Sequence, residues 1–397
     1  MSPSQLETFP LLAVIYAISV YAFMLIYATI FLRFSAVKES LTISPSRYGS
    51  IDGLRGLLAT GVFVHHSFAA YGYFTHGHWK WSSSAVLNQL GQSTVALFFM
   101  ITGFLFTLKA MSPKVDWKAL YISRIVRLAP LYTIIVCLVF FAVFILSDGV
   151  IKESAWNIVT EFALWLSFVC FGRPDINAYP MSWTLIAGVN WSLKYEIEFY
   201  LFGVPALYWA SKFISTRAAF FVTASALAFL LVFRSFNLVA GYTIFTAHFL
   251  GGILTAYAFQ IPKAKELMQK IQFKYFAGIA ACSLLFMQNY AGALAVLSAI
   301  IIFAAIVGGA SIFGVLTSRS ALWLGDISYG IYLIHGFVLW VALASLRKMV
   351  NLVQIDLLLY WAIIVTLSGV IAFLASLSYI KIEKPAMTTF TGKGRRA

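Results

Sequence analysis

Apolar residues are grouped along this chain in long runs, separated by short segments rich in Lys, Arg, Gly, Pro or Asn. A helix needs about 20 mostly apolar residues to cross the hydrocarbon core of a bilayer. Eleven runs approach that length, so the pattern predicts an all-α, polytopic bundle of about eleven transmembrane helices. The predicted spans are 9–32, 53–73, 88–109, 129–147, 192–211, 218–233, 238–258, 274–290, 292–314, 325–345 and 357–380.

One further apolar segment, 155–171, is shorter, carries Glu161 and is flanked by polar loops. We interpret it as an interfacial or re-entrant helix, because it is too short and too polar for a span. Counting it as a span would reverse the orientation of every helix before it.

The composition supports a membrane protein. Of the 397 residues, 61% are hydrophobic and only 11% are charged, and the mean hydropathy is +0.88. These values exclude an ordinary soluble globular domain, so lipid is the expected surrounding of most of the chain. Membrane lipids are therefore expected partners.

The basic residues orient the bundle, because loops rich in Lys and Arg are retained in the cytoplasm. An external N-terminus and eleven spans place 21 of the 28 basic residues, and the C-terminus, on the cytoplasmic side. The net charge of +14 then reflects topology and gives no reason to expect nucleic acid as a partner. A basic cytoplasmic face can still attract a phosphorylated ligand.

Ionisable residues within apolar spans are costly, so each requires a partner or a function. The second span reads IDGLRGLLATGVFVHHSF, with Arg55 at its start and His66 eleven positions later. That spacing puts both side chains on one helix face about 16 Å apart, with His65 about 100° away. This suits an anionic donor whose reactive end reaches a histidine base. The alternative is an arginine anchor at the headgroups and histidines that only satisfy helix contacts.

Three later segments add ionisable groups. Arg124 and Arg127 are three positions apart before Pro130, where they can grip phosphate or simply flank a span. Glu196 and Glu198 lie inside the apolar run that follows Trp191, and either a salt bridge or a role in proton transfer explains them. In the tenth span, His335 follows Tyr329 and Tyr332, and a histidine bonded to a backbone carbonyl is the competing interpretation.

The external segments contain many aromatic residues that can stack on sugars or anchor the chain at the interface. His76 and His78 in HGHW are too few for a metal site, so no metal is expected. The aromatic residues in question are Tyr71, Tyr73, Trp79, Trp81, Trp156, Trp165 and Trp183.

In their order, the motifs resemble acyltransferase family 3, membrane proteins that O-acylate bacterial cell-surface glycans and related acceptors. The resemblance rests on DGLRG with the Arg55 and His66 pair, FFMITGF, RxxRLxPLY, WSLKYEIEFYL, SYGIYLIH and IEKP, and it spans positions 52 to 385. It implies a core of ten spans, 49–388, preceded by an extra transmembrane helix and a cytoplasmic linker, 1–48. A basic cytoplasmic tail, 389–397, follows the core.

The resemblance also implies roles for individual residues. By position, His66, Arg55, Glu196 and His335 would be catalytic, and Arg124 and Arg127, with Arg55, would bind the acyl-coenzyme A donor. We further expect Trp191, Ser192, Glu198 and Tyr329 to contact the acceptor. Two positions depart from the family: Glu198 stands where Gln is common, and Thr102 stands where Ser is frequent. Glu198 therefore adds a charge that bears on acceptor choice.

The expected activity is transfer of an acyl group, with acetyl as the family's usual group, from cytoplasmic acetyl-coenzyme A to a hydroxyl of a glycan or lipid-linked sugar. His66 would act as a general base or as a transient acyl carrier, and the sequence leaves both routes open. No tightly bound cofactor is expected, and the bacterial inner membrane is the expected location. The alternative function is a transporter or flippase with an intramembrane proton relay, since buried Arg, Glu and His also line transport pathways. The acceptor and the oligomeric state stay open.

Overall fold

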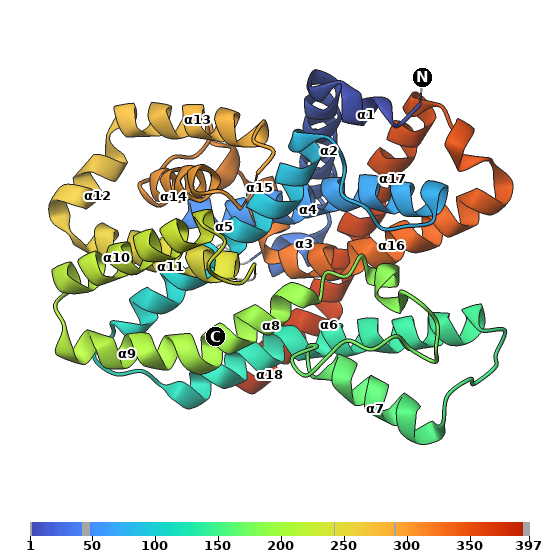
Figure 1. Ribbon diagram of the computed structural model, residues 1–397, viewed down its shortest axis with the longest axis horizontal. Helices are drawn as coiled ribbons and strands as arrows, with labels where there is room; N and C mark the ends of the chain where they lie inside the picture. Colours follow the sequence, from blue (N-terminus) through green and yellow to red (C-terminus); the bar gives the residue numbers. More distant parts are fainter. Residues whose placement is uncertain (1, 42–47, 242, 290, 392–397) are drawn as a thin grey trace.

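The computed structural model describes residues 2–41, 48–241, 243–289 and 291–391, which fold into helices joined by loops (Figure 1). Within those ranges the β structure is limited to one isolated bridge between Ile176 and Tyr179, so the predicted all-α class is confirmed. The α-helices are α1 (Gln5–Thr8), α2 (Pro10–Phe31), α3 (Ser35–Ser40), α4 (Gly49–His76), α5 (Ala85–Ala110), α6 (Trp117–Leu146), α7 (Ala155–Leu166), α8 (Trp191–Glu198), α9 (Val204–Phe213), α10 (Thr216–Ser235), α11 (Thr243–Gln260), α12 (Pro262–Gln269), α13 (Ile271–Leu285), α14 (Ala293–Val307), α15 (Arg319–Asp326), α16 (Ser328–Met349), α17 (Leu357–Ser378) and α18 (Lys384–Thr391).

Shorter helical turns complete the chain. Two π-helical turns, η2 (Phe199–Gly203) and η5 (Tyr379–Glu383), join α8 to α9 and α17 to α18. Three 3₁₀ turns, η1 (Ser182–Ile186), η3 (Val315–Thr317) and η4 (Leu352–Gln354), lie in loops. Such π-turns locally widen a helix without ending it, so each pair of helices continues across its turn.

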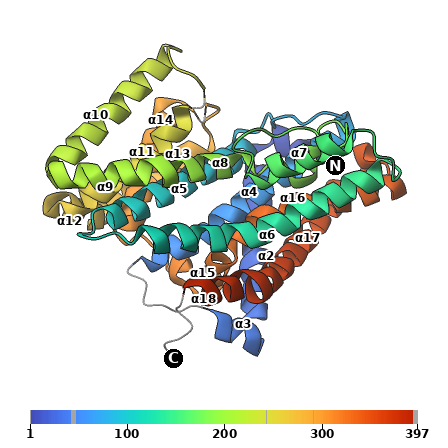
Figure 2. The ribbon, with the colours of Figure 1, turned by 90° about the horizontal axis from the view of Figure 1, so that it is seen from below.

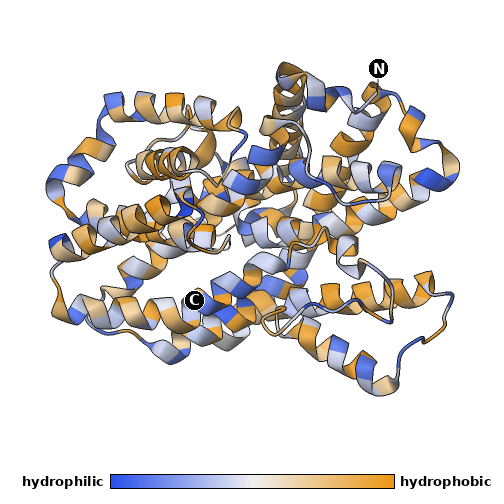
Figure 3. Cartoon of the chain, viewed as in Figure 1, coloured by the Kyte–Doolittle hydropathy of each residue, from blue (hydrophilic) through white to orange (hydrophobic). Residues whose placement is uncertain are grey.

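Six described helices are long and apolar enough to cross a membrane, and the bent pair of α11 and α12 would make a seventh. The six are α2, α5, α6, α10, α16 and the helix that runs through α17 to Thr389. Large apolar side chains are exposed on these helices, for example Phe141 on α6 and Phe229 on α10, and hydrophobic colouring extends along both helices (Figure 3). The chain is an integral membrane protein.

The expected count of eleven spans is thus met only in part, for physical reasons that differ between segments. The predicted spans 274–290 and 292–314 form helices of only 15 residues each, about 22 Å long and shorter than the hydrocarbon core. The span at 192–211 forms α8 and α9, which continue across η2, but it carries Lys194, Glu196 and Glu198, whereas the apolar stretch of each of the six spans holds at most two charged residues. The span at 53–73 forms α4, whose polar residues lower its hydropathy, and protein rather than lipid surrounds most of it.

The segment 155–171 contains the 12-residue helix α7 rather than a span. Its Glu161 accepts a hydrogen bond from the backbone N–H of Asn177, 3.0 Å away, which ties α7 to the following loop. Burial raises the pKa of Glu161, and this hydrogen bond opposes the rise.

Helix α4 runs through the interior of the bundle, where it packs against α2, α5, α15 and α16 (Figures 1 and 2). Most of its residues are buried. Helix α5 in turn packs closely on α11, because small residues let the two backbones approach. A Cβ atom at Gly103 would lie 2.6 Å from the carbonyl oxygen of Phe249, so glycine at this position permits the close approach.

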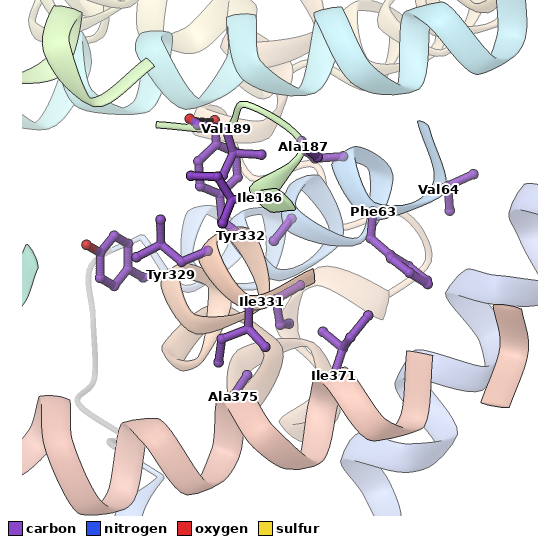
Figure 4. Close-up of a cluster of buried hydrophobic side chains, with 14 of the residues drawn as sticks. Phe63, Val64, Ile186, Ala187, Val189, Tyr329, Ile331, Tyr332, Ile371 and Ala375 are labelled. Atoms are coloured by element: carbon purple, nitrogen blue, oxygen red, sulfur yellow. Dashed lines mark hydrogen bonds between the residues drawn. The ribbon is translucent and has the colours of Figure 1, made fainter. Parts of the chain in front are cut away.

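The loop before α8 enters the bundle and packs on α16. A Cβ atom at Gly336 would lie 2.3 Å from the carbonyl carbon of Ile186 in η1, so only glycine fits directly after His335. Ile186 and Val189 lie beside Tyr332 in a cluster that also includes Ile331 (Figure 4). This loop therefore meets α16 at the turn that carries His335.

Candidate active site

A cavity of about 340 Å³ lies where α4, α5, α6, α8 and α16 meet. Small-molecule sites range from roughly 300 to 1,000 Å³, so this cavity matches a small ligand or part of a larger one. Its walls combine apolar residues of α5 with polar residues of the other helices. Six of the predicted site residues line it: Arg55, Arg124, Arg127, Ser192, Glu196 and Tyr329.

Positive charge dominates the polar lining. Arg55 of α4 and Arg124 and Arg127 of α6 face two carboxylates, those of Asp52 and Glu196. Arg124 also lies 5.4 Å from the ring centroid of Phe106, which covers the apolar side of its guanidinium. Three guanidiniums in a partly enclosed cavity form a site for an anion, since their planar donor groups match phosphate oxygens.

Helix α6 presents its arginine pair to the cavity because it begins well before the predicted span. Asp116 caps its first turn by accepting a hydrogen bond from the N–H of Ala119, at 2.9 Å. Helix α6 then runs on through Pro130. At Leu128, directly after Arg127, the hydroxyl of Tyr329 donates to the backbone carbonyl at 2.7 Å and links α16 to α6.

Glu196 has a partner on its own helix. The hydroxyl of Tyr200, one turn later, donates a hydrogen bond to its carboxylate. Both residues line the cavity. Glu196 is thus hydrogen-bonded to Tyr200, whereas the imidazole of His66 is hydrogen-bonded to another histidine.

His66 and His335 form a hydrogen-bonded pair between α4 and α16. Nδ1 of His66 lies 2.9 Å from Nε2 of His335, and the two rings stack with centroids 5.1 Å apart. His335 is fully buried, and His66 is half-buried. The pair joins two positions that are 269 residues apart in the sequence.

The hydrogen bonds define the proton positions of the neutral pair. Nδ1 of His335 lies 2.9 Å from the Ile331 carbonyl oxygen, which can only accept, so this nitrogen carries the proton. Nε2 of His335 is then an acceptor, and Nδ1 of His66 must donate to it. The remaining nitrogen, Nε2 of His66, keeps a free lone pair. A histidine oriented in this way by a second group is the arrangement of a general base.

His65 has a different environment, as its position on the helix predicted. Its Nδ1 donates to the Leu87 carbonyl at 2.9 Å, and the side chain is buried against Gly91 of α5. It therefore fastens α4 to α5 and has no contact with His335 comparable to that of His66.

Tyr332, with its partner Ser192, connects the lining of the cavity to the histidine pair. Both line the cavity, their hydroxyls are hydrogen-bonded at 2.7 Å, and the Tyr332 hydroxyl also donates to the Val189 carbonyl at 2.9 Å. The Tyr332 ring centroid lies 6.2 Å from that of His335. Tyr332 is therefore the residue of the cavity lining that lies next to His335 in the structure.

Two predicted acceptor residues lie outside the cavity lining. Trp191 packs against Phe245 of α11 with ring centroids 4.8 Å apart. Glu198 lies 3.9 Å from Lys194 in a half-exposed pair. The structure therefore groups Ser192 and Tyr329 with the arginines and leaves Trp191 and Glu198 apart from them.

On the side of His66 away from the arginines, the loops contribute aromatic groups. The Trp79 ring centroid lies 5.9 Å from that of His66 and 5.6 Å from that of Trp183 in η1. The guanidinium carbon of Arg173 lies 5.0 Å from the Trp183 ring centroid. Burial lowers the pKa of Arg173, and the charge of Asp175 opposes that shift. In the part of the chain that the structure describes, no group of three or more His, Cys, Asp or Glu side chains is arranged to hold a metal ion.

Sequence reasoning missed several residues of this region. Tyr332 was named only as a neighbour of His335, and its contact with Ser192 crosses 140 positions. Arg173 carried one usable signal: it is one of the few basic residues that the predicted topology leaves outside, next to the aromatic loop segments.

Comparison with known proteins gives one match. The model of acyltransferase family 3, described as an acyltransferase domain, matches residues 48–377. No curated protein and no solved structure matches the chain. The matched region contains α4 to α16 and almost all of α17, and therefore both the arginine cavity and the histidine pair.

Proposed function

The chain belongs to acyltransferase family 3, and from that premise we propose that this membrane-bound acyltransferase moves an acetyl group from acetyl-coenzyme A to a glycan hydroxyl. The observation that carries the proposal is the alignment of an arginine-lined cavity with an oriented histidine beyond it. The family accounts for the acyl transfer itself. The choice of acetyl, of coenzyme A and of a glycan is our proposal.

The donor would bind with its phosphates against Arg124 and Arg127, and Arg55 lines the same cavity. Bidentate arginine contacts suit phosphate oxygens, and the excess of positive charge attracts a polyanion. The apolar wall of α5, which includes Phe98 and Phe106, would cover the pantetheine arm. The thioester would then approach the pair of Ser192 and Tyr332, from which it would reach towards His66.

Chemistry would take place at Nε2 of His66. This nitrogen accepts the proton of the acceptor hydroxyl while the hydroxyl oxygen attacks the thioester carbonyl carbon. The carbon–sulfur bond breaks, and the departing coenzyme A thiolate takes up the proton from the imidazolium. His335 stabilises the imidazolium by accepting a hydrogen bond from the Nδ1–H group of His66, which keeps this proton. The products are an ester and free coenzyme A.

The acceptor would approach from the side of Trp79 and Trp183. Aromatic rings stack on the apolar faces of sugars, and Arg173, next to Trp183, offers hydrogen-bond donors to sugar hydroxyls. We propose the orientation that the basic residues favour, with eleven membrane segments, the arginine cavity open to the cytoplasm and the aromatic loops outside. The extra helix α2 would then start outside.

The test is acyl transfer by the purified protein, with acetyl-coenzyme A labelled in the acetyl group and a panel of glycan acceptors. We expect labelled ester with the wild type and none with His66→Ala. The matched control is His65→Ala, which removes the adjacent imidazole and should retain transfer in proportion to its folded fraction. Equal transfer by His66→Ala and the wild type would contradict the proposed role of His66.

A further inference from the structure

Helix α2 packs on the histidine helix and forms a hydrogen bond to it, although α2 lies before the matched family region, which begins at residue 48. The hydroxyl of Tyr16 on α2 is 2.7 Å from the hydroxyl of Ser67 on α4. Ser67 directly follows His66. Both Tyr16 and Ser67 are fully buried, so solvent cannot replace this contact.

From this contact we propose that α2 is a positioning element for His66, with Tyr16 as the positioning residue acting through Ser67. The inference rests on the proposed function of His66 as the base. It assigns a role to a helix that precedes the matched region, and it predicts that a single buried hydroxyl on α2 controls turnover.

The hydrogen bonds around Ser67 have one consistent direction. The Ser67 hydroxyl donates to the Val64 carbonyl at 2.7 Å. A hydroxyl has one proton, so Ser67 must accept from Tyr16. A second tyrosine, Tyr360 of α17, donates to the Ser67 carbonyl at 2.9 Å. Two helices thus hold the side chain and the backbone of one residue of α4.

Helices α2 and α17 are themselves joined beside this point. The indole N–H of Trp361 donates to the Ser19 hydroxyl at 2.7 Å, and the rings of Trp361 and Tyr16 meet edge to face with centroids 5.3 Å apart. Tyr360 is fully buried, as Tyr16 is. Packing between apolar side chains is not directional, whereas hydrogen bonds are, so these hydroxyls fix the rotation of α4 about its axis.

The rotation of α4 decides where His66 lies. Ser67 is held on one side of the helix by α2 and α17, and His66, about 100° around the helix, bonds His335 of α16. A side chain about 6 Å from the helix axis moves by about 1 Å when the helix turns by about 10°. A displacement of that size at a reacting group lowers the rate by up to about 100-fold.

The experiment compares Tyr16→Phe with Tyr27→Phe in the full-length protein. Tyr27 is on the same helix and packs at Gly369 of α17, and among the described residues its hydroxyl has no hydrogen bond. Each change removes one oxygen atom. Turnover, KM for acetyl-coenzyme A and the thermal midpoint are measured for the wild type, both single variants, Ser67→Ala, and the double variant of Tyr16→Phe with Ser67→Ala.

We expect Tyr16→Phe and Ser67→Ala each to lower kcat by about 10-fold or more while KM for acetyl-coenzyme A stays within about twofold, because the donor cavity is unchanged. The double variant should be no slower than the slower single variant, because both changes break the same contact. Tyr27→Phe should match the wild type.

Three results would overturn the inference. The first is a kcat of Tyr16→Phe equal to that of Tyr27→Phe. The second is a loss of kcat that parallels the fall in thermal midpoint in both of these variants. The third is a double variant whose loss of kcat equals the product of the two single losses. Failure of the proposed function is distinguishable, because the wild type itself would then transfer no acetyl group; that outcome removes the basis of this inference as well.

Discussion

The hydrogen bond between His66 and His335 leads to an ordered prediction for substitutions at His335. Leucine removes the acceptor for the Nδ1 proton of His66. Asparagine places its amide near the position of Nδ1, towards the Ile331 carbonyl, and so does not reach His66. Glutamine is longer, and its carbonyl oxygen can take the place of Nε2, 2.9 Å from His66 in the native pair.

The magnitude follows from the loss of one buried partner. A buried donor left without an acceptor costs about 1 to 3 kcal/mol, which corresponds to a roughly 5- to 150-fold loss of rate when the cost is met in the transition state. We therefore expect His335→Leu and His335→Asn to lose kcat by about 10- to 100-fold, and His335→Gln to retain activity within about 10-fold of the wild type.

The assay is steady-state transfer from labelled acetyl-coenzyme A, with the thermal midpoint of each variant as the control for folding. KM for the donor should change little, because His335 does not line the arginine cavity. If His335→Leu is as active as His335→Gln, the pair does not orient His66 and the reasoning from its hydrogen bonds is refuted.

Three further predictions concern the cavity, the surface and the packing of the loop. Arg124→Gln and Arg127→Gln should each raise KM for acetyl-coenzyme A by about 10-fold or more, because each removes a charged donor to phosphate; an unchanged KM with a lower kcat would contradict donor binding there. Glu198→Gln should change turnover by less than about twofold and the free energy of unfolding by less than about 0.5 kcal/mol, since its ion pair is half-exposed. Steady-state kinetics with several acceptors and thermal unfolding check the two values. Gly336→Ala should lower the free energy of unfolding by about 1 to 3 kcal/mol, because the new methyl group meets the backbone of Ile186. A thermal midpoint equal to that of the wild type would contradict this prediction and show that the loop moves to accommodate the methyl group.

Local sequence patterns were sufficient for the fold class and for the polar face of α4. The helical period placed Arg55 and His66 on one face, and the structure has Arg55 in the cavity and His66 beyond it. The spacing of Arg124 and Arg127 likewise put both on one face of α6, and both line the cavity. These features depend only on residues within a few turns of one helix, which is why the sequence could predict them.

Contacts between distant segments were beyond that reasoning. The partner of His66 comes from a helix 269 positions later, and the partner of Ser67 from α2, 51 positions earlier. The prediction of eleven spans overestimated the lengths of several helices for a related reason. Apolar runs such as 292–314 continue past Gly309, whose φ of +95° follows the end of α14. Hydropathy does not register such a turn, because the residues on both sides of it are equally apolar.

The most direct test of the account uses the protein reconstituted in vesicles, in the orientation that exposes the arginine cavity to the outside solution. Labelled acetyl-coenzyme A is added outside, the glycan acceptor is enclosed, and labelled ester on the enclosed glycan is measured. The account predicts labelled ester in the lumen with the wild type and none with His66→Ala. Labelled ester in the lumen at the same rate with His66→Ala, or with vesicles that hold no protein, would contradict it.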